Sequence, residues 1–158
     1  MPVRTLVEAV NDALRTEMEL DENVLVLGED VGTLGGVFRA TAGLQDRFGP
    51  DRCIDTPLAE AGILGTAVGL AMAGWRPVCE MQYDAFSYPC LDQLICHVGR
   101  YRWRTAGAMD FPITIRLQPG LVIPSASGMV TRWLSIAVVS MERCGWISSA
   151  KSRPRRCM

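Results

Sequence analysis

The sequence predicts an α/β domain built on a parallel sheet, and two observations lead to that prediction. Short apolar runs that end in turns alternate with segments of helical periodicity over residues 1 to about 117. The connections between them are short, as in layered α/β domains. The 158 residues are 49% hydrophobic and 21% charged, with a net charge of −1, which suits one globular domain with a single core.

The first predicted element is an amphipathic helix. Thr5 and Glu8 have the spacing of a capping box, which marks a helix start. The apolar residues that then recur on one face are Leu6, Val7, Val10, Leu14 and Met18. Residues 24–27 follow as an apolar run that ends at Gly28, which is typical of a strand buried on both faces.

Two strand–helix units are expected next. A glycine-rich loop over residues 32–43, which could cover a site, precedes a short helix at 41–48 and a strand at 53–55. Pro57 then opens a helix that runs to about residue 72 and is closed by Gly74. Further along, we expect a strand at 76–82, a helix at 88–104 and a strand at 113–117.

Ligands of parallel sheets bind beyond the carboxyl ends of the strands. Glu29, Glu60 and the segment after Glu80 are all expected at that edge. The chain contains neither G-x-G-x-x-G nor G-x-x-x-x-G-K-[ST], so nucleotide binding through a phosphate loop is not expected.

Composition excludes several other classes of protein. The near-neutral charge does not favour nucleic acid, and the apolar run at 61–75 is shorter than the roughly 20 residues of a membrane helix. The N-terminus lacks the pattern of a secretory signal, so a cytoplasmic location is expected. The six cysteines form no C-x-x-C pair and are expected to be scattered buried thiols: Cys53, Cys79, Cys90, Cys96, Cys144 and Cys157.

The predicted helix after Pro57 has two unusual features. Its glycines, at positions 62, 65, 69 and 74, cost up to about 1 kcal/mol each relative to alanine. Close packing of helices within the chain, or close approach of a partner's helix, would each compensate for that cost. Glu60 lies in the first turn, where a carboxylate either stabilises the helix dipole or serves a function in a poorly solvated site.

Several motifs resemble those of β subunits of 2-oxoacid dehydrogenases, over about residues 3–117. They are LGEDV, GVFR, RCIDTPLAE and a helix that contains YPCLDQ. They are more similar to branched-chain or acetoin-type members than to the pyruvate enzymes. The resemblance implies that residues 1–117 form a transketolase-like, thiamine-diphosphate pyrimidine-binding domain.

The resemblance also implies the residues of a site. Glu60 matches the family's glutamate that hydrogen-bonds the cofactor's aminopyrimidine and favours its imino tautomer, which makes it the expected catalytic residue. Phe86 matches the aromatic residue on which the aminopyrimidine stacks. Leu58 and Glu29 are expected to complete the cofactor-binding set, whereas His97 is expected to be a packing or surface residue.

The partners and reaction implied are those of the family. An α subunit would supply the magnesium and diphosphate site, so no metal ligands are expected in this chain. A second β subunit and an acyltransferase core would complete the assembly. The parent reaction is oxidative decarboxylation of a 2-oxoacid with transfer of the acyl group to a lipoyl arm. This half of the site does not indicate which 2-oxoacid.

The sequence departs from the family after residue 117. LQPGLVIPSASG stands where the family has a glycine-rich turn and a histidine. Residues 1–120 hold ten Arg and sixteen acids (net −6), whereas residues 121–158 hold five Arg, one Lys and one acid (net +5). A shifted reading frame or a truncated gene would explain both changes, and residues 118–158 are expected to be an atypical tail that adds little to the fold.

The departure leaves alternatives to an active enzyme subunit. The chain alone is expected to lack activity, because it has no room for the family's second domain. One alternative is a non-catalytic truncated product or assembly fragment that binds partner subunits. A second, a stand-alone nucleotide-binding module, is disfavoured because the chain has no phosphate loop.

Overall fold

The computed structural model describes residues 4–109, 111–117 and 139–140. Its strands are β1 (Val24–Gly28), β2 (Cys53–Asp55), β3 (Arg76–Met81), β4 (Thr114–Leu117) and β5 (Val139–Ser140). Its helical segments are α1 (Leu6–Leu20), α2 (Leu44–Phe48), α3 (Glu60–Met72), the 3₁₀ helix η1 (Asp84–Cys90), the π-helix η2 (Gln93–Val98) and α4 (Tyr101–Arg104).

The strands form one sheet in the order β2-β1-β3-β4-β5. Strands β1 to β4 pair in parallel, which confirms the predicted α/β class with a parallel sheet. The short strand β5 pairs antiparallel with β4, with Ser140 opposite Thr114. The rest of the predicted tail, residues 118–138 and 141–158, lies outside the described residues.

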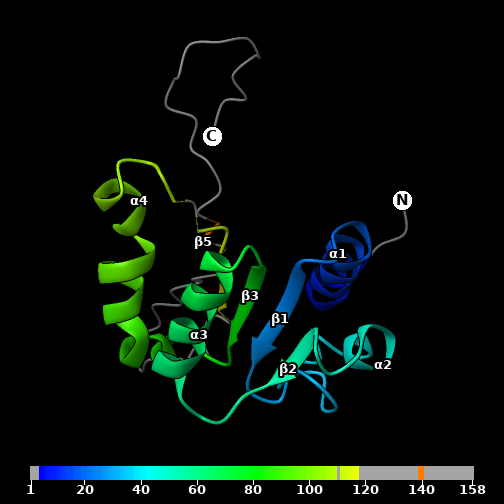
Figure 1. Ribbon diagram of the computed structural model, residues 1–158. Helices are drawn as coiled ribbons and strands as arrows, with labels where there is room; N and C mark the ends of the chain where they lie inside the picture. The colour runs from blue at the N-terminus through cyan, green and yellow to red at the C-terminus, as the bar shows by residue number, and fades with distance from the viewer. Residues whose placement is uncertain (1–3, 110, 118–138, 141–158) are drawn as a thin grey trace, which may run out of the picture.

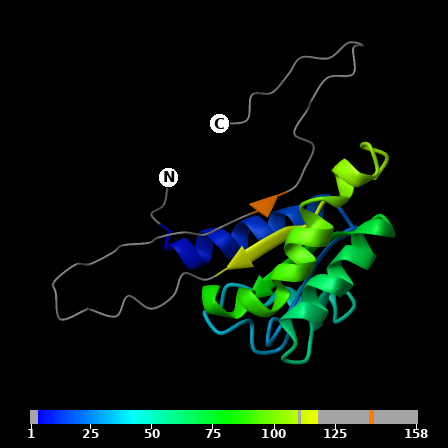
Figure 2. The same cartoon turned by 90° about the vertical axis from the view of Figure 1, so that its left-hand side faces the viewer.

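The sheet is the middle of three layers (Figures 1 and 2). On one face, α3 and the segments η1 and η2 pack on the sheet around Leu27, Leu64 and Cys79. On the other face, α1 and α2 pack on the sheet around Met18, Val26 and Leu44. All five strand residues of β1 are buried, as predicted for a central parallel strand.

Helix α1 begins as predicted. The Thr5 side chain accepts a hydrogen bond from the Glu8 backbone, and the Glu8 carboxylate accepts one from the Thr5 backbone at 2.7 Å, which completes the capping box. The carbonyls at and just after the end of the helix are capped by Arg52, which follows α2 in the sequence. The Arg52 Nη2 atom donates to the carbonyls of Met18, Asp21 and Val24 at 2.7–2.9 Å.

Residues 88–104 do not form the single helix predicted for them. The chain begins to coil earlier, at Asp84, and passes through the tight turns of η1, the wide turn of η2 and the separate helix α4. Pro89 lies inside η1, and proline restricts the residue before it. At the end of η2, the Gly99 N–H reaches back to the Leu94 carbonyl at 2.8 Å, the spacing of a π turn.

Helix α3 also starts later than the proline signal indicated. Its N-cap is Ala59 and its first residue is Glu60, whereas Pro57 and Leu58 lie in the turn from β2. The first helical bond runs from Ile63 N–H to the Ala59 carbonyl at 2.9 Å. No described helix is both long and apolar enough to cross a membrane.

The glycines of α3 do not serve close packing within the described chain. A Cβ atom at Gly62 would meet nothing nearer than 3.6 Å, and at Gly69 nothing within 4 Å. Gly62, Gly65 and Gly69 are all exposed. The interpretation that they fit α3 against a neighbouring helix of the same chain is therefore wrong for the described residues, and approach of a partner's helix stays a prediction.

Candidate functional site

The polar residues of interest gather at the carboxyl edge of the parallel sheet. In the sheet register, Gly28 of β1 stands beside Asp55 of β2 and Glu80 of β3. The Thr56 N–H donates to the Gly28 carbonyl at 2.9 Å, which holds the turn into α3 beside the end of β1. Glu29 directly follows Gly28, so this contact positions Glu29 near the start of α3.

Glu29 is a buried carboxyl group with no compensating partner in the described part of the chain. Its side chain is 6% exposed, and neither Oε1 nor Oε2 has a hydrogen-bond partner there. Burial raises the pKa of Glu29, and the nearby Glu60 and Asp30 charges raise it further. The carboxyl group of Glu29 therefore keeps its proton to a higher pH than an exposed glutamate does.

Glu60 occupies the first position of α3 and is half-buried. Its charge raises the pKa of Glu29 and contributes to the raised pKa of Cys90 in η1, after burial of that thiol. The Glu60 carboxylate therefore lies near both residues. The structure brings the two predicted acidic site residues together, although they are 31 positions apart in the sequence.

The two predicted apolar site residues lie on the flanking segments and are open to solvent. Leu58, in the turn before α3, is 76% exposed. Phe86, in η1, is 40% exposed, and η1 packs against α3. His97 is half-buried in η2.

Two charged residues near this edge were missed by the sequence reasoning. Glu80 and Arg116 are adjacent in the register of β3 and β4, and both are buried. The Arg116 Nε atom donates to Glu80 Oε2 at 3.2 Å, and its Nη2 atom pairs with Oε1. The available signal was one charged residue of each sign, each one place before the end of its strand, Glu80 in β3 and Arg116 in β4.

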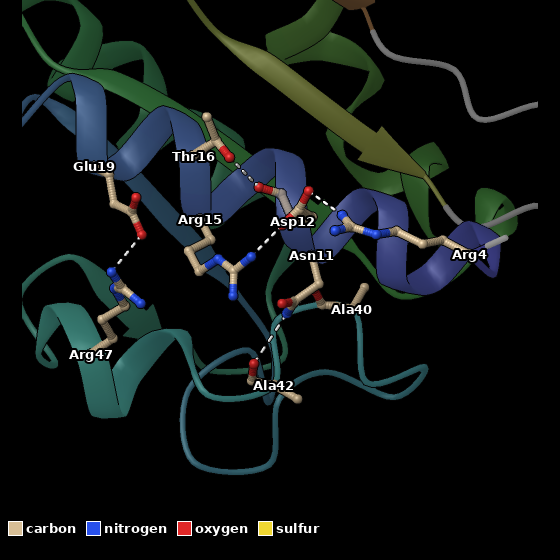
Figure 3. Close-up of polar contacts among 9 residues, drawn as sticks. All are labelled: Arg4, Asn11, Asp12, Arg15, Thr16, Glu19, Ala40, Ala42 and Arg47. Carbon is tan, nitrogen blue, oxygen red and sulfur yellow. Dashed lines mark hydrogen bonds and ion pairs between the residues drawn. The ribbon is translucent and has the colours of Figure 1, made fainter. Parts of the chain in front are cut away.

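The loop over residues 29–43, between β1 and α2, is held by hydrogen bonds within itself and to the rest of the fold. Asn11 of α1 donates to the carbonyls of Ala40 and Ala42 at 2.9 and 3.1 Å (Figure 3). The buried Thr41 hydroxyl donates to the Val31 carbonyl at 2.7 Å. The Gly32 N–H donates to Asp55 Oδ1 at 2.6 Å.

The described cysteines are free thiols, as predicted. Cys53, Cys79 and Cys90 are buried and Cys96 is half-buried, whereas Cys144 and Cys157 lie outside the described residues. Burial raises the pKa of Cys53 and of Cys79 to about 12, so both thiols stay protonated at neutral pH. Among the described residues, no group of three or more histidine, cysteine or acidic side chains could hold a metal ion.

Comparison with known proteins identifies the class to which this fold and site belong. Residues 4–116 match the family "Transketolase, pyrimidine binding domain", and the chain belongs to this family of domains from thiamine-diphosphate-dependent enzymes. The match includes Glu29, Leu58, Glu60 and Phe86.

The relatives found are β subunits of 2-oxoacid dehydrogenases. The chain is 55% identical over 125 residues to the 3-methyl-2-oxobutanoate dehydrogenase subunit beta of Mycobacterium tuberculosis, covering 79% of this chain and 34% of that protein. It is 49% identical over 146 residues to the pyruvate dehydrogenase E1 component subunit beta of Bacillus subtilis, covering 88% of this chain and 45% of that protein.

Two facts follow from the extent of these alignments. The chain spans between a third and a half of the length of these relatives. Residues 1–117 make up less than 88% of the chain, so the Bacillus subtilis alignment continues into the segment after Leu117.

Proposed function

We propose that this chain provides the pyrimidine-binding half of a thiamine-diphosphate site in the β subunit of a 2-oxoacid dehydrogenase decarboxylating component. The observation that carries the proposal is the buried carboxyl group of Glu29, which has no hydrogen-bond partner in the described chain, beside Glu60 at the carboxyl edge of the sheet. A buried polar group without a partner is costly, so such a group points to a missing ligand.

The residues present fit an aminopyrimidine. The ring is planar and carries nitrogen atoms that accept or donate hydrogen bonds, and Glu60 and Glu29 offer carboxyl groups on neighbouring elements. The exposed ring of Phe86 is available for stacking, and Leu58 offers an exposed apolar side chain in the turn before α3. When bound, thiamine diphosphate supplies the carbanion chemistry of decarboxylation.

The roles of the chain's own residues follow from their surroundings. Glu60 would hold a proton between its carboxylate and a ring nitrogen, which sets the protonation state of the cofactor. Glu29, whose pKa is raised by burial and by the Glu60 charge, would hold its proton to a higher pH than an exposed glutamate and so reduce repulsion between the two carboxyl groups. Phe86 and Leu58 would orient the ring and exclude water.

The test of this proposal is Glu60→Gln in a β subunit of the full length of its relatives, assembled with its α subunit. We expect turnover of the 2-oxoacid to fall at least about a hundredfold, the usual scale for a positioned proton-transfer group. Glu22→Gln, in the turn after α1, is the matched control because Glu22 is exposed and precedes β1, at the opposite end of that strand from Glu29. Turnover of the Glu60 variant within about threefold of the parent would remove Glu60 from the mechanism.

The same proposal makes the chain by itself an incomplete site. The α subunit would hold the diphosphate and magnesium, and a second β subunit and an acyltransferase core would complete the complex. Calorimetry of the isolated chain with thiamine diphosphate and magnesium should therefore show no tight binding. A dissociation constant near or below about 1 μM, which corresponds to roughly 8 kcal/mol, would contradict the two-sided site.

A second candidate function is a non-catalytic fragment that binds partner subunits. Copurification with the α subunit without 2-oxoacid turnover would favour this candidate over an active subunit.

A further inference from the structure

The ring of Phe86 packs against a second aromatic ring, that of Tyr83. The ring of Tyr83 lies 5.4 Å from the ring of Phe86, centroid to centroid, at an interplanar angle of 80°. The two residues are also joined through the backbone, since the Phe86 N–H donates to the Tyr83 carbonyl at 3.1 Å. This bond closes one tight turn, so the relative position of the two side chains is restricted.

Tyr83 in turn packs against loop 29–43. Its ring lies 5.6 Å from the ring of Phe38, at an interplanar angle of 79°. Both contacts therefore have the edge-to-face geometry that aromatic pairs prefer. Phe38 and Tyr83 are half-buried, whereas Phe86 is 40% exposed, so Phe86 is the most exposed of the three rings.

Phe38 is carried by backbone that is fixed on both sides. Upstream, the Gly36 N–H donates to the Asp30 carbonyl at 2.7 Å. Downstream, Asn11 of α1 binds the carbonyls of Ala40 and Ala42 (Figure 3). A ring that packs against Phe38 is therefore braced by α1 and by the end of β1.

We infer that Tyr83 and Phe38 are positioning residues that fix the ring of Phe86 for stacking on the ligand. An exposed aromatic side chain in a short 3₁₀ segment would otherwise sample several rotamers, and ordering it on binding would reduce affinity. Packing against Tyr83 orders the Phe86 ring before the ligand binds. The ligand in this inference comes from the proposed function, whereas the ordering of the Phe86 ring by Tyr83 does not depend on that function.

The first experiment measures the order of the Phe86 ring by NMR relaxation in the full chain, with carbon-13 in the phenylalanine rings. Tyr83→Leu should lower the ring order parameter of Phe86, whereas Tyr83→Phe, which keeps the ring, should restore it. Tyr88→Leu is the matched control, since Tyr88 is a 71% exposed aromatic residue in the same segment. If Tyr83→Leu unfolds the chain, Phe38→Leu tests the same row of three rings from the end farther from Phe86. An unchanged Phe86 ring in folded Tyr83→Leu or Phe38→Leu would overturn the inference.

The second experiment measures thiamine diphosphate affinity in the subunit complex by a double-mutant cycle. Tyr83→Leu should weaken binding between about twofold and tenfold, as expected for the loss of an aromatic pair. In a Phe86→Leu background, Tyr83→Leu should have almost no further effect, because Tyr83 acts through Phe86. Fully additive losses would overturn the inference.

The two failures can be told apart. If neither Phe86→Leu nor Tyr83→Leu changes the affinity, while the ring order still depends on Tyr83, the proposed ligand is wrong and the positioning role remains. If Phe86→Leu weakens binding but Tyr83→Leu does not, the site is supported and the positioning role is overturned.

Discussion

Arg116 binds the carboxylate of Glu80 through two of its nitrogen atoms in the interior of the fold, linking β3 to β4. Burial raises the pKa of Glu80, and the Arg116 charge opposes that rise. Position 36, next to Glu80, requires glycine for two reasons. A Cβ atom there would lie 2.9 Å from Glu80 Oε1, and the backbone φ of Gly36 is +75°. The ion pair and the loop that contains Gly36 therefore pack against each other.

Removing one member of this pair should cost more stability than removing both. We expect Arg116→Met to lower the free energy of unfolding by about 3–5 kcal/mol, because it leaves a buried carboxylate unpaired. The double variant with Glu80→Leu should regain part of that loss. Urea denaturation measures both, and an Arg116→Met loss below about 1 kcal/mol would show that water or another group satisfies Glu80.

Arg52 and Arg47 offer a matched pair of arginines. The guanidinium of each lies over the ring of Phe48, but Arg52 also binds three backbone carbonyls, whereas Arg47 forms an exposed ion pair with Glu19 at 2.7 Å (Figure 3). We expect Arg52→Met to destabilise the chain by about 2 kcal/mol or more, since it strands carbonyls at the end of α1. Arg47→Met should cost less than about 1 kcal/mol. Equal losses in urea denaturation would argue against the capping role of Arg52.

Glu29 should make stability depend on pH. Its pKa is raised in the folded chain, so its favourable contribution is complete below the pKa of the unfolded chain and is lost as pH rises through the folded value. Glu29→Gln removes that loss. The variant should therefore unfold at a higher urea concentration than the parent at pH 7–8, with the difference shrinking toward about pH 4. A difference independent of pH would show that Glu29 does not titrate with folding.

Gly69 of α3 should tolerate a larger side chain in the isolated chain. A Cβ there meets nothing within 4 Å, so Gly69→Ala should raise the free energy of unfolding by up to about 1 kcal/mol through helix propensity. Gly28→Ala is the contrasting control, because its Cβ would lie 2.6 Å from the Glu80 carbonyl, and it should destabilise. If a partner's helix approaches this face, Gly69→Ala should also weaken subunit association, as measured by sedimentation.

The parts of the fold that were predictable have strong local signals. The capping box of Thr5 and Glu8 marked the start of α1, and the apolar run before Gly28 marked the central strand. Residues 84–104 were not predictable in the same way, because their apolar spacing is compatible with a regular helix while Pro89 and the π turn at Gly99 change its path.

The candidate site was predictable to a similar degree. The placement of Glu29 near Glu60 follows from the rule that parallel strands end at one edge, and the structure brings the two together. The supporting contacts were not visible, because they depend on side-chain geometry across long separations. The Glu80–Arg116 pair and the packing of Tyr83 against Phe38 are of this kind.

The parallel register of β1 has a consequence for how the chain folds. Val26 pairs with Cys53 on one side and with Val78 on the other, so the central strand cannot gain either neighbour until a whole strand–helix unit has been synthesised and collapsed. Each pairing closes a long loop before it forms stabilising contacts, which is the topology that folds slowly. During that interval the apolar strand is available to other chains, and its protection depends on how quickly α3 and β3 arrive.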